Sequence, residues 1–329
     1  MARLRLFANL REAAGTSTVD IDGASVGQVL ETAAGKYGQT FESGLATAKV
    51  WVNGEPASSE TPVTESDEVA VLPPVSGGET VAPTTDYTQV LIEGALAGAL
   101  LIAAFTSLQI FVFAVVATGL AWVWDLRDVT AARGRRIAPI PPMVAVAAAA
   151  NGAYGWGYSG FAVGLVIGVA TALAWGVFFD ENRDTRSIAV TSLVAILSGL
   201  GAGALTLIRM RTVEEAAGFL IIAGLAGLAG WAALTFAPEG VDQNIAAAAV
   251  AVVASVLVAA FTDQIEFSVA LLGGAAIGAA IIAGRAFGSL LRAGEISHTE
   301  RAPGLLVGLD GAVLAAAAFW MVLAIFAAG

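Results

Sequence analysis

The sequence contains no cysteine and a single histidine, His298, and it contains no lysine after Lys49. The absence of cysteine excludes disulfides, thiolate catalysis and cysteine metal sites. With one histidine, a zinc site would need carboxylates for nearly every ligand, which disfavours it. We therefore expect no metal site, and the residues give no sign of a cofactor.

Charged residues are also scarce. They make up 13% of the 329 residues, whereas 57% are hydrophobic and the mean hydropathy is +0.79. Soluble domains have about a quarter of their residues charged, so a polytopic membrane protein is the first interpretation, with the lipid bilayer as its surroundings. Acidic residues outnumber basic ones by 27 to 16. Without a basic face to neutralise phosphates, nucleic acid is not an expected partner.

The chain changes character at the segment LPPVSGG, residues 72–78. The sequence before it has the composition of a small soluble domain, and nearly everything after it is too apolar to fold in water. Its two prolines end the preceding strand because they cannot donate to a sheet ladder. Gly77 and Gly78 carry no side chain, so an extended backbone here could enter a narrow groove. The segment is either a linker, which composition favours, or a substrate for another enzyme.

Residues 1–80 show the periodicities of a small α+β domain. Apolar alternation predicts strands over residues 3–8, 18–21, 49–52 and 67–72. Ser25 as an N-cap, followed by apolar residues at helical spacing and then by Gly35 and Gly38, predicts one helix. Asn53 and Gly54 predict a tight hairpin turn. The order β, β, α, β, β suits an α+β roll with the helix on the sheet.

Four segments carry a family resemblance: RLRLFANLREAAG, VGQVLETAAGKYG, VWVNGEPA and DEVAVLPPVSGG. In this order they resemble the small sulfur-carrier subunit of molybdopterin synthase, in the MoaD/ThiS group of ubiquitin-like β-grasp proteins. The resemblance covers residues 1–78. In that group an E1-like enzyme adenylates the C-terminal glycine carboxylate, which becomes a thiocarboxylate that donates sulfur. The resemblance thus implies Gly78 as the reactive terminus and Gly77 as the residue that lets the tail be threaded. It implies an E1-like adenylating enzyme or the molybdopterin synthase large subunit as partner.

Gly78 is followed here by Glu79 and 250 further residues. A peptide carbonyl has no free carboxylate to activate, so sulfur-carrier chemistry requires cleavage after Gly78. The alternative is that the β-grasp domain is used only as an interaction module.

Beyond the linker, residues 79–88, the remaining residues 89–329 are expected to form an all-α membrane domain. A span needs about 20 apolar residues, and we count about nine: 89–105, 108–124, 140–154, 158–179, 187–208, 215–236, 245–261, 267–283 and 304–327. Nine arginines fall in the loops on the side of the N-terminal domain and two, Arg209 and Arg211, on the other. This bias predicts an integral plasma-membrane protein of a prokaryote with a cytoplasmic N-terminal domain.

Charges inside the spans are few. Glu93 lies one turn into the first span, from which it could reach the interface, and Asp310 lies one turn into the last. Asp310 is expected near the cytoplasmic surface, close to Arg292, His298 and Arg301. Because a charge in lipid is costly, two roles stay open for Asp310. It is either an interfacial carboxylate paired with arginine, or a catalytic residue with those three as binding residues.

Two segments carry a second resemblance: AWVWDLRDVTAARGRRIAPIP and GRAFGSLLRAGEISHTERAPGLLVGLDGAVLAA. Their order and spacing resemble the phosphatidate cytidylyltransferases (CDP-diacylglycerol synthases), which join CTP to phosphatidic acid with metal-bound carboxylates. The pattern departs where the family has an aspartate in the sixth span, here LAGLAGW, and a lysine-bearing loop, here APEGVDQN. We therefore interpret this half as a related scaffold that has lost catalysis. The alternatives are an active enzyme using Mg²⁺ and CTP at an atypical site, and a lipid-binding or structural membrane protein.

Overall fold

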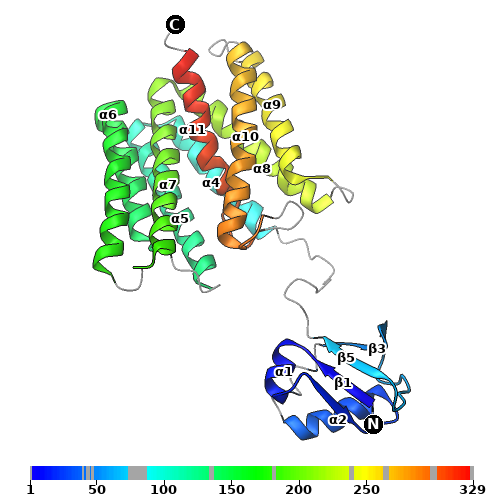
Figure 1. The fold of residues 1–329 in the computed structure, drawn as a ribbon. Helices are drawn as coiled ribbons and strands as arrows, with labels where there is room; N and C mark the ends of the chain where they lie inside the picture. Colours follow the sequence, from blue (N-terminus) through cyan, green and yellow to red (C-terminus); the bar gives the residue numbers. More distant parts are fainter. Residues whose placement is uncertain are drawn as a thin grey trace. The chain divides into compact units, whose positions relative to one another are not determined.

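The computed structural model describes residues 2–38, 41, 45, 48–72, 87–132, 137–179, 183–236, 241–261, 267–296 and 302–326. The chain forms two compact units, Met1–Thr84 and Thr85–Gly329 (Figure 1). The first is a small sheet with helices, and the second is entirely helical within the residues described.

The N-terminal unit is a mixed five-stranded sheet with the strand order β2-β1-β5-β3-β4. The strands are β1 (Ala2–Leu6), β2 (Thr18–Ile21), β3 (Lys49–Val52), β4 (Glu55–Pro56) and β5 (Glu68–Leu72). β1 and β5 run parallel at the centre, and the other pairs are antiparallel. This is the β-grasp arrangement that the sequence predicts.

Helix α2 (Val26–Tyr37) supplies the helical layer of this unit. As predicted, Ser25 is its N-cap, and the Ser25 hydroxyl accepts a hydrogen bond from the Gln28 amide at 3.4 Å. The Gln28 side chain reaches back to accept from the amide of Ala24, the residue before the N-cap, at 2.9 Å. The buried side chains of α2 join those of β1 and β5 in one apolar core: Leu4, Leu6, Val26, Val29, Ala33, Val69 and Val71.

Two short elements were not predicted. The strand expected over residues 3–8 ends at Leu6, because Ala8 begins helix α1 (Ala8–Ala14), and Phe7 is left 37% exposed. The two-residue strand β4 follows a turn in which Asn53 and Gly54 both have positive φ, 53° and 87°. This turn is the tight hairpin that the Asn-Gly pair predicts. Elements as short as α1 and β4 leave too few residues for a period to be recognised.

The helical unit contains, in its described part, the helices α4 (Thr88–Ala104), α5 (Leu108–Ala131), α6 (Ile140–Phe178), α7 (Thr185–Arg211), α8 (Val213–Phe236), α9 (Gln243–Phe261), α10 (Phe267–Arg292) and α11 (Gly308–Phe326). Seven of them are long and apolar enough to cross a membrane, and α4 is a shorter apolar helix. These helices indicate an integral membrane protein. α11 packs between α7 and α10 (Figure 1).

Helix α6 is a tight hairpin of two spans. Its backbone leaves the helical region at Trp156 (φ −136°) and Gly157 (φ 59°, ψ −136°), a conformation that favours glycine. Beyond this point the chain runs back along itself, because a Cβ atom built on Gly152 would overlap the carbonyl of Gly160. Gly164 likewise lies against the backbone of Ala148. With α6 counted as two segments, the described part of the unit contains nine helical segments, in agreement with the count of about nine expected from the sequence.

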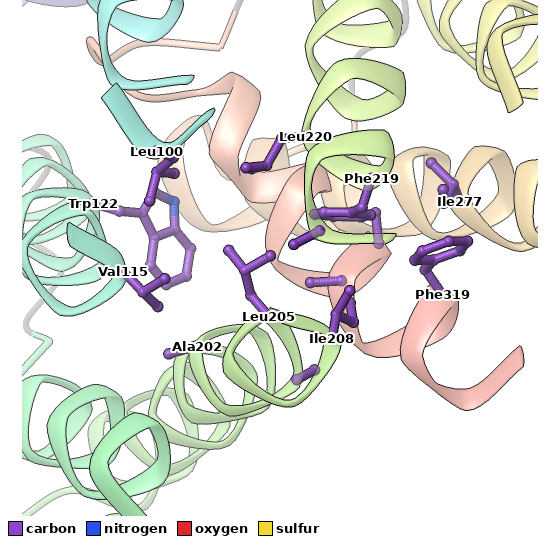
Figure 2. Packing of buried hydrophobic residues seen from close by; sticks show 14 of the residues in the cluster. Leu100, Val115, Trp122, Ala202, Leu205, Ile208, Phe219, Leu220, Ile277 and Phe319 are labelled. Atoms are coloured by element: carbon purple, nitrogen blue, oxygen red, sulfur yellow. The ribbon is translucent and has the colours of Figure 1, made fainter. Parts of the chain in front are cut away.

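The helical bundle is apolar inside and outside. Its interior is one large cluster, in which Leu100, Val115 and Trp122 lie on one side of Leu205 (Figure 2). Large side chains also cover the outside, with Phe113 75% exposed and Phe178 77% exposed. Exposed apolar side chains of this size are unfavourable in water and suit contact with lipid.

Candidate functional site

The first candidate site is the diglycine tail of the N-terminal unit. β5 ends at Leu72, and Gly77 and Gly78 lie outside the described residues. The structure does describe the strand that leads into the tail. β5 is held on both sides, by β1 through pairs such as Arg3 with Glu68 and by β3 through pairs such as Lys49 with Leu72. The chain thus enters the tail from the centre of the sheet.

The second candidate site is a buried ionic cluster at one end of the helical unit. Arg292, in the last turn of α10, is fully buried and donates from Nε to Oδ2 of Asp310 at 2.8 Å and from Nη2 to Oδ1 at 3.0 Å. Its Nη1 donates to Oδ2 of Asp125 on α5 at 2.7 Å. Trp122, one turn before Asp125, donates from Nε1 to Oδ1 of Asp310 at 2.7 Å. Three helices therefore meet at one guanidinium.

Asp125 also fixes the segment between α10 and α11. Its Oδ1 accepts from the Leu305 amide at 2.9 Å, and its Oδ2 accepts from the Leu306 amide at 3.2 Å. Asp310 can lie this close to α10 only because residue 288 is glycine, where a Cβ atom would overlap the Asp310 carboxylate. Every carboxylate oxygen of Asp125 and Asp310 thus has a donor, which is the condition for burying such groups.

A second set of polar groups lies beside this cluster. The Glu93 carboxylate on α4 accepts from the amide of Gly308, the first residue of α11, at 2.6 Å and from Gln89 Nε2 at 3.1 Å. A carboxylate at a helix start is favourable because the free amides there carry partial positive charge. Among the described residues, Arg285 Nη1, Trp231 Nε1 and Gln89 Oε1 are buried without a hydrogen-bond partner.

These carboxylates do not form a metal-binding set. Asp125 and Asp310 face the same guanidinium, and the part of the chain that the structure describes holds no group of three His, Cys, Asp or Glu side chains placed to share an ion. The donor set therefore does not fit the paired metal carboxylates that phosphoryl transfer uses.

Of the residues singled out in the sequence, the structure brings Asp310 and Arg292 together. His298 and Arg301 lie outside the described residues. Sequence reasoning missed Asp125 because it ended the second span at residue 124, whereas α5 continues to Ala131. It also missed Trp122. The run WVWDLRD gave the available signal, since two aspartates follow within one apolar helix.

Comparison with known proteins gives a consistent result for the N-terminal unit. The ThiS family model matches residues 4–78. Small archaeal modifier protein 1 of Haloferax volcanii is 36% identical over 88 residues, which are 22% of this chain and 97% of that protein. The crystal structure of SAMP1 from Haloferax volcanii aligns with a TM-score of 0.21 at 38% identity and covers 23% of this chain and 98% of that one.

Proposed function

We propose, on the premise that the chain belongs to the ThiS family through its N-terminal unit, that it is a membrane-tethered ubiquitin-like protein. The N-terminal unit acts as a sulfur carrier or protein modifier at the cytoplasmic face of a prokaryotic plasma membrane. The helical unit holds the uncleaved chain in the membrane. The observation that supports this most directly is the family match itself, which runs to Gly78 and so includes the diglycine tail.

The chemistry requires one preliminary step. Hydrolysis of the peptide bond between Gly78 and Glu79 would release the N-terminal unit with a free Gly78 carboxylate. An E1-like partner would then join this carboxylate to AMP from ATP, with loss of pyrophosphate. Attack by sulfide (HS⁻) on the acyl carbon would form the C–S bond, displace AMP and leave the thiocarboxylate, with no change of oxidation state. Gly77 keeps the tail narrow enough to reach such an active site. Delivery to the molybdopterin synthase large subunit is one use of this sulfur.

The alternative function of the N-terminal unit, as an interaction module, requires no cleavage after Gly78. The uncleaved N-terminal unit would then recruit a cytosolic partner to the membrane as an interaction module. Its support is the complete core of the unit, which is independent of the helical unit.

For the helical unit we propose a cytidylyltransferase-like scaffold without catalysis. Its support is the engagement of Asp125 and Asp310 by Arg292, which leaves neither carboxylate available to a metal. The alternative, synthesis of CDP-diacylglycerol from CTP and phosphatidic acid with Mg²⁺, predicts transfer of labelled CTP into lipid by the purified protein. Absence of transfer across several divalent metals would support the scaffold.

The decisive experiment is the intact mass of the native protein carrying an N-terminal tag, measured in soluble and membrane fractions. A soluble species ending at Gly78, heavier by the difference between sulfur and oxygen, would establish the processed sulfur carrier. Gly78→Val should abolish it, because a branched side chain does not fit a diglycine-threading groove. Gly35→Ala is the matched control, since a Cβ atom there meets nothing within 4 Å. A single full-length membrane species would exclude Gly78 chemistry and leave the interaction module.

A further inference from the structure

The helical unit contains an apolar, partly open cavity of about 280 Å³. Its walls come from α4, α5, α7, α8 and α11, and Leu100, Val115 and Trp122 face Leu205 and Leu220 across it (Figure 2). At about 30 Å³ for each water-sized volume it holds roughly nine such volumes. That is close to the lower limit of about 300 Å³ for small-ligand sites, so the cavity suits one acyl or isoprenoid chain.

The cavity borders the lipid-facing surface between α4 and α8. Gly94 on α4 and Leu228 on α8 both line it, and both are exposed on the outside of the bundle, Leu228 at 48%. Gly94 and Gly224 have no atom within 4 Å of a built Cβ position, so here the glycines leave room and do not bring helices together. A chain could therefore enter sideways from the bilayer.

One end of the cavity is polar. A smaller space of about 40 Å³ adjoins it, and Glu93, Gly227 and Gly308 line both. The smaller space is also lined by Gln89, Trp231 and Arg285. Each of these three has a buried atom without a partner in the described part of the chain. Two of the atoms are donors, Arg285 Nη1 and Trp231 Nε1, and one is an acceptor, Gln89 Oε1.

The charged residues around the polar end of the cavity do not favour an anionic ligand. Arg285 and Arg292 are opposed by Glu93, Asp125 and Asp310, and Glu93 and Asp310 act electrostatically on Arg285. The formal charges of these five described residues sum to −1. A carboxylate or phosphate head would add negative charge where the described residues hold no cation in excess, which is costly at low dielectric. A hydroxyl can accept from the two donors and donate to Gln89 without adding charge.

We propose that this cavity binds one chain of a neutral hydroxyl-bearing lipid, with its head among Gln89, Trp231 and Arg285. The site is independent of the diglycine tail and of any processing at Gly78. A neutral glyceride or a long-chain alcohol has this chemistry, and phosphatidic acid does not.

The test uses the full-length protein, purified in detergent and stripped of lipid, with three probes of equal chain length. These are decanoylglycerol, decanoate and decyl phosphate, and retention of each is measured by native mass spectrometry. We expect decanoylglycerol to be retained at least about tenfold more tightly than either anion, because each anion would bring a buried charge that the described residues do not compensate. Tighter binding of decanoate or decyl phosphate would overturn the neutral head.

Gly224→Leu places a side chain in the cavity from a position whose Cβ meets no atom within 4 Å, and it should abolish retention of decanoylglycerol. Gly98→Leu is its control, because Gly98 also has nothing within 4 Å but does not line the cavity. Equal retention by the Gly224→Leu and unchanged proteins would overturn the site.

A separate variant tests where the hydroxyl head of the lipid binds. Trp231→Phe removes the Nε1 donor and keeps an aromatic ring against Tyr87 and Phe236. It should weaken retention of decanoylglycerol roughly five- to tenfold, the usual effect of one buried hydrogen bond. Unchanged retention would show that the head does not lie there.

Discussion

Arg292 and Asp310 form a two-point ion pair inside the helical unit, with hydrogen bonds of 2.8 and 3.0 Å, and Arg292 also holds Asp125 at 2.7 Å. One guanidinium thus pairs with two carboxylates from different helices. The three charges are not interchangeable, because loss of Arg292 leaves two carboxylates without a cation, whereas loss of Asp310 leaves Arg292 with a partner.

We predict that Arg292→Met destabilises the helical unit more than Asp310→Asn does. Removing one partner of a buried pair costs about 3–5 kcal/mol, and here two carboxylates are affected. The thermal midpoint of the detergent-solubilised protein, followed by size-exclusion chromatography, measures this. Arg127→Met is the control, since its pair with Asp128 is exposed, and should cost below about 1 kcal/mol. Equal midpoints for Arg292→Met and Arg127→Met would contradict the prediction.

We predict that one added methyl group at Gly152, inside the α6 hairpin, lowers the stability of the helical unit. Gly152→Ala places a Cβ atom on the Gly160 carbonyl and must separate the two spans. We expect a loss of about 1–3 kcal/mol, as for other overpacked interiors. Gly155→Ala, which meets nothing within 4 Å, should be neutral in the same thermal assay. If both alanines behave alike, the two spans do not pack through glycine.

Asp67 predicts an acid-sensitive N-terminal unit. Hydrogen bonds from the Thr64 hydroxyl, the Asn53 amide group and the Thr64 backbone amide hold the pKa of this carboxyl below its ordinary value. A depressed pKa stabilises the folded state above the unfolded pKa of about 3.9. That contribution is lost as the pH falls through the folded pKa.

The measurement is thermal unfolding of residues 1–84, which have their own core. Asp67→Asn should lower the midpoint at pH 7, and the two proteins should converge in strong acid. Thr64→Val removes only the hydroxyl donor and should fall between them. A constant difference at every pH would show that the carboxylate charge is not the cause.

The orientation in the membrane can be tested because the chain has no cysteine. Two cysteine variants would mark the two ends of α5. Phe105→Cys lies just before the start of α5, at the C-cap of α4, where Phe105 is 67% exposed. Ala131→Cys lies at the last residue of α5. With a cytoplasmic N-terminal unit, an impermeant maleimide should label Phe105→Cys in intact cells and Ala131→Cys only after lysis. The reverse pattern would place the N-terminal unit outside.

Local patterns predicted most of the fold. Ser25 and the Asn53–Gly54 pair act through neighbours a few residues away, so their cap and turn could be recognised from the sequence. The nine helices followed from hydropathy, and the division of α6 followed from the weakly apolar residues around Trp156. α5 and α10 were predicted too short, because both helices continue through charged residues, Asp125 and Arg285, where hydropathy falls. Asp125 can lie inside the bundle because Arg292 of α10 pairs with it.

The ionic cluster could be predicted only in part. A carboxylate one turn into a span made Asp310 conspicuous, and Arg292 was a nearby cation in the sequence. Asp125 lies 167 residues before Arg292, and no local period links them. Glu93 was expected to turn toward the interface, but its carboxylate accepts from the Gly308 amide at the start of α11. Contacts of this kind depend on how the helices pack.

The separation of Asp125 from Arg292 also sets an order of assembly. The contacts within α6 join residues close in the chain and can form as soon as that hairpin is made. Asp125 enters the membrane long before its cation is synthesised, because Arg292 follows 167 residues later. Until then the nascent chain carries the Asp125 carboxylate without its arginine, so the ionic cluster can close only after α10 has been inserted.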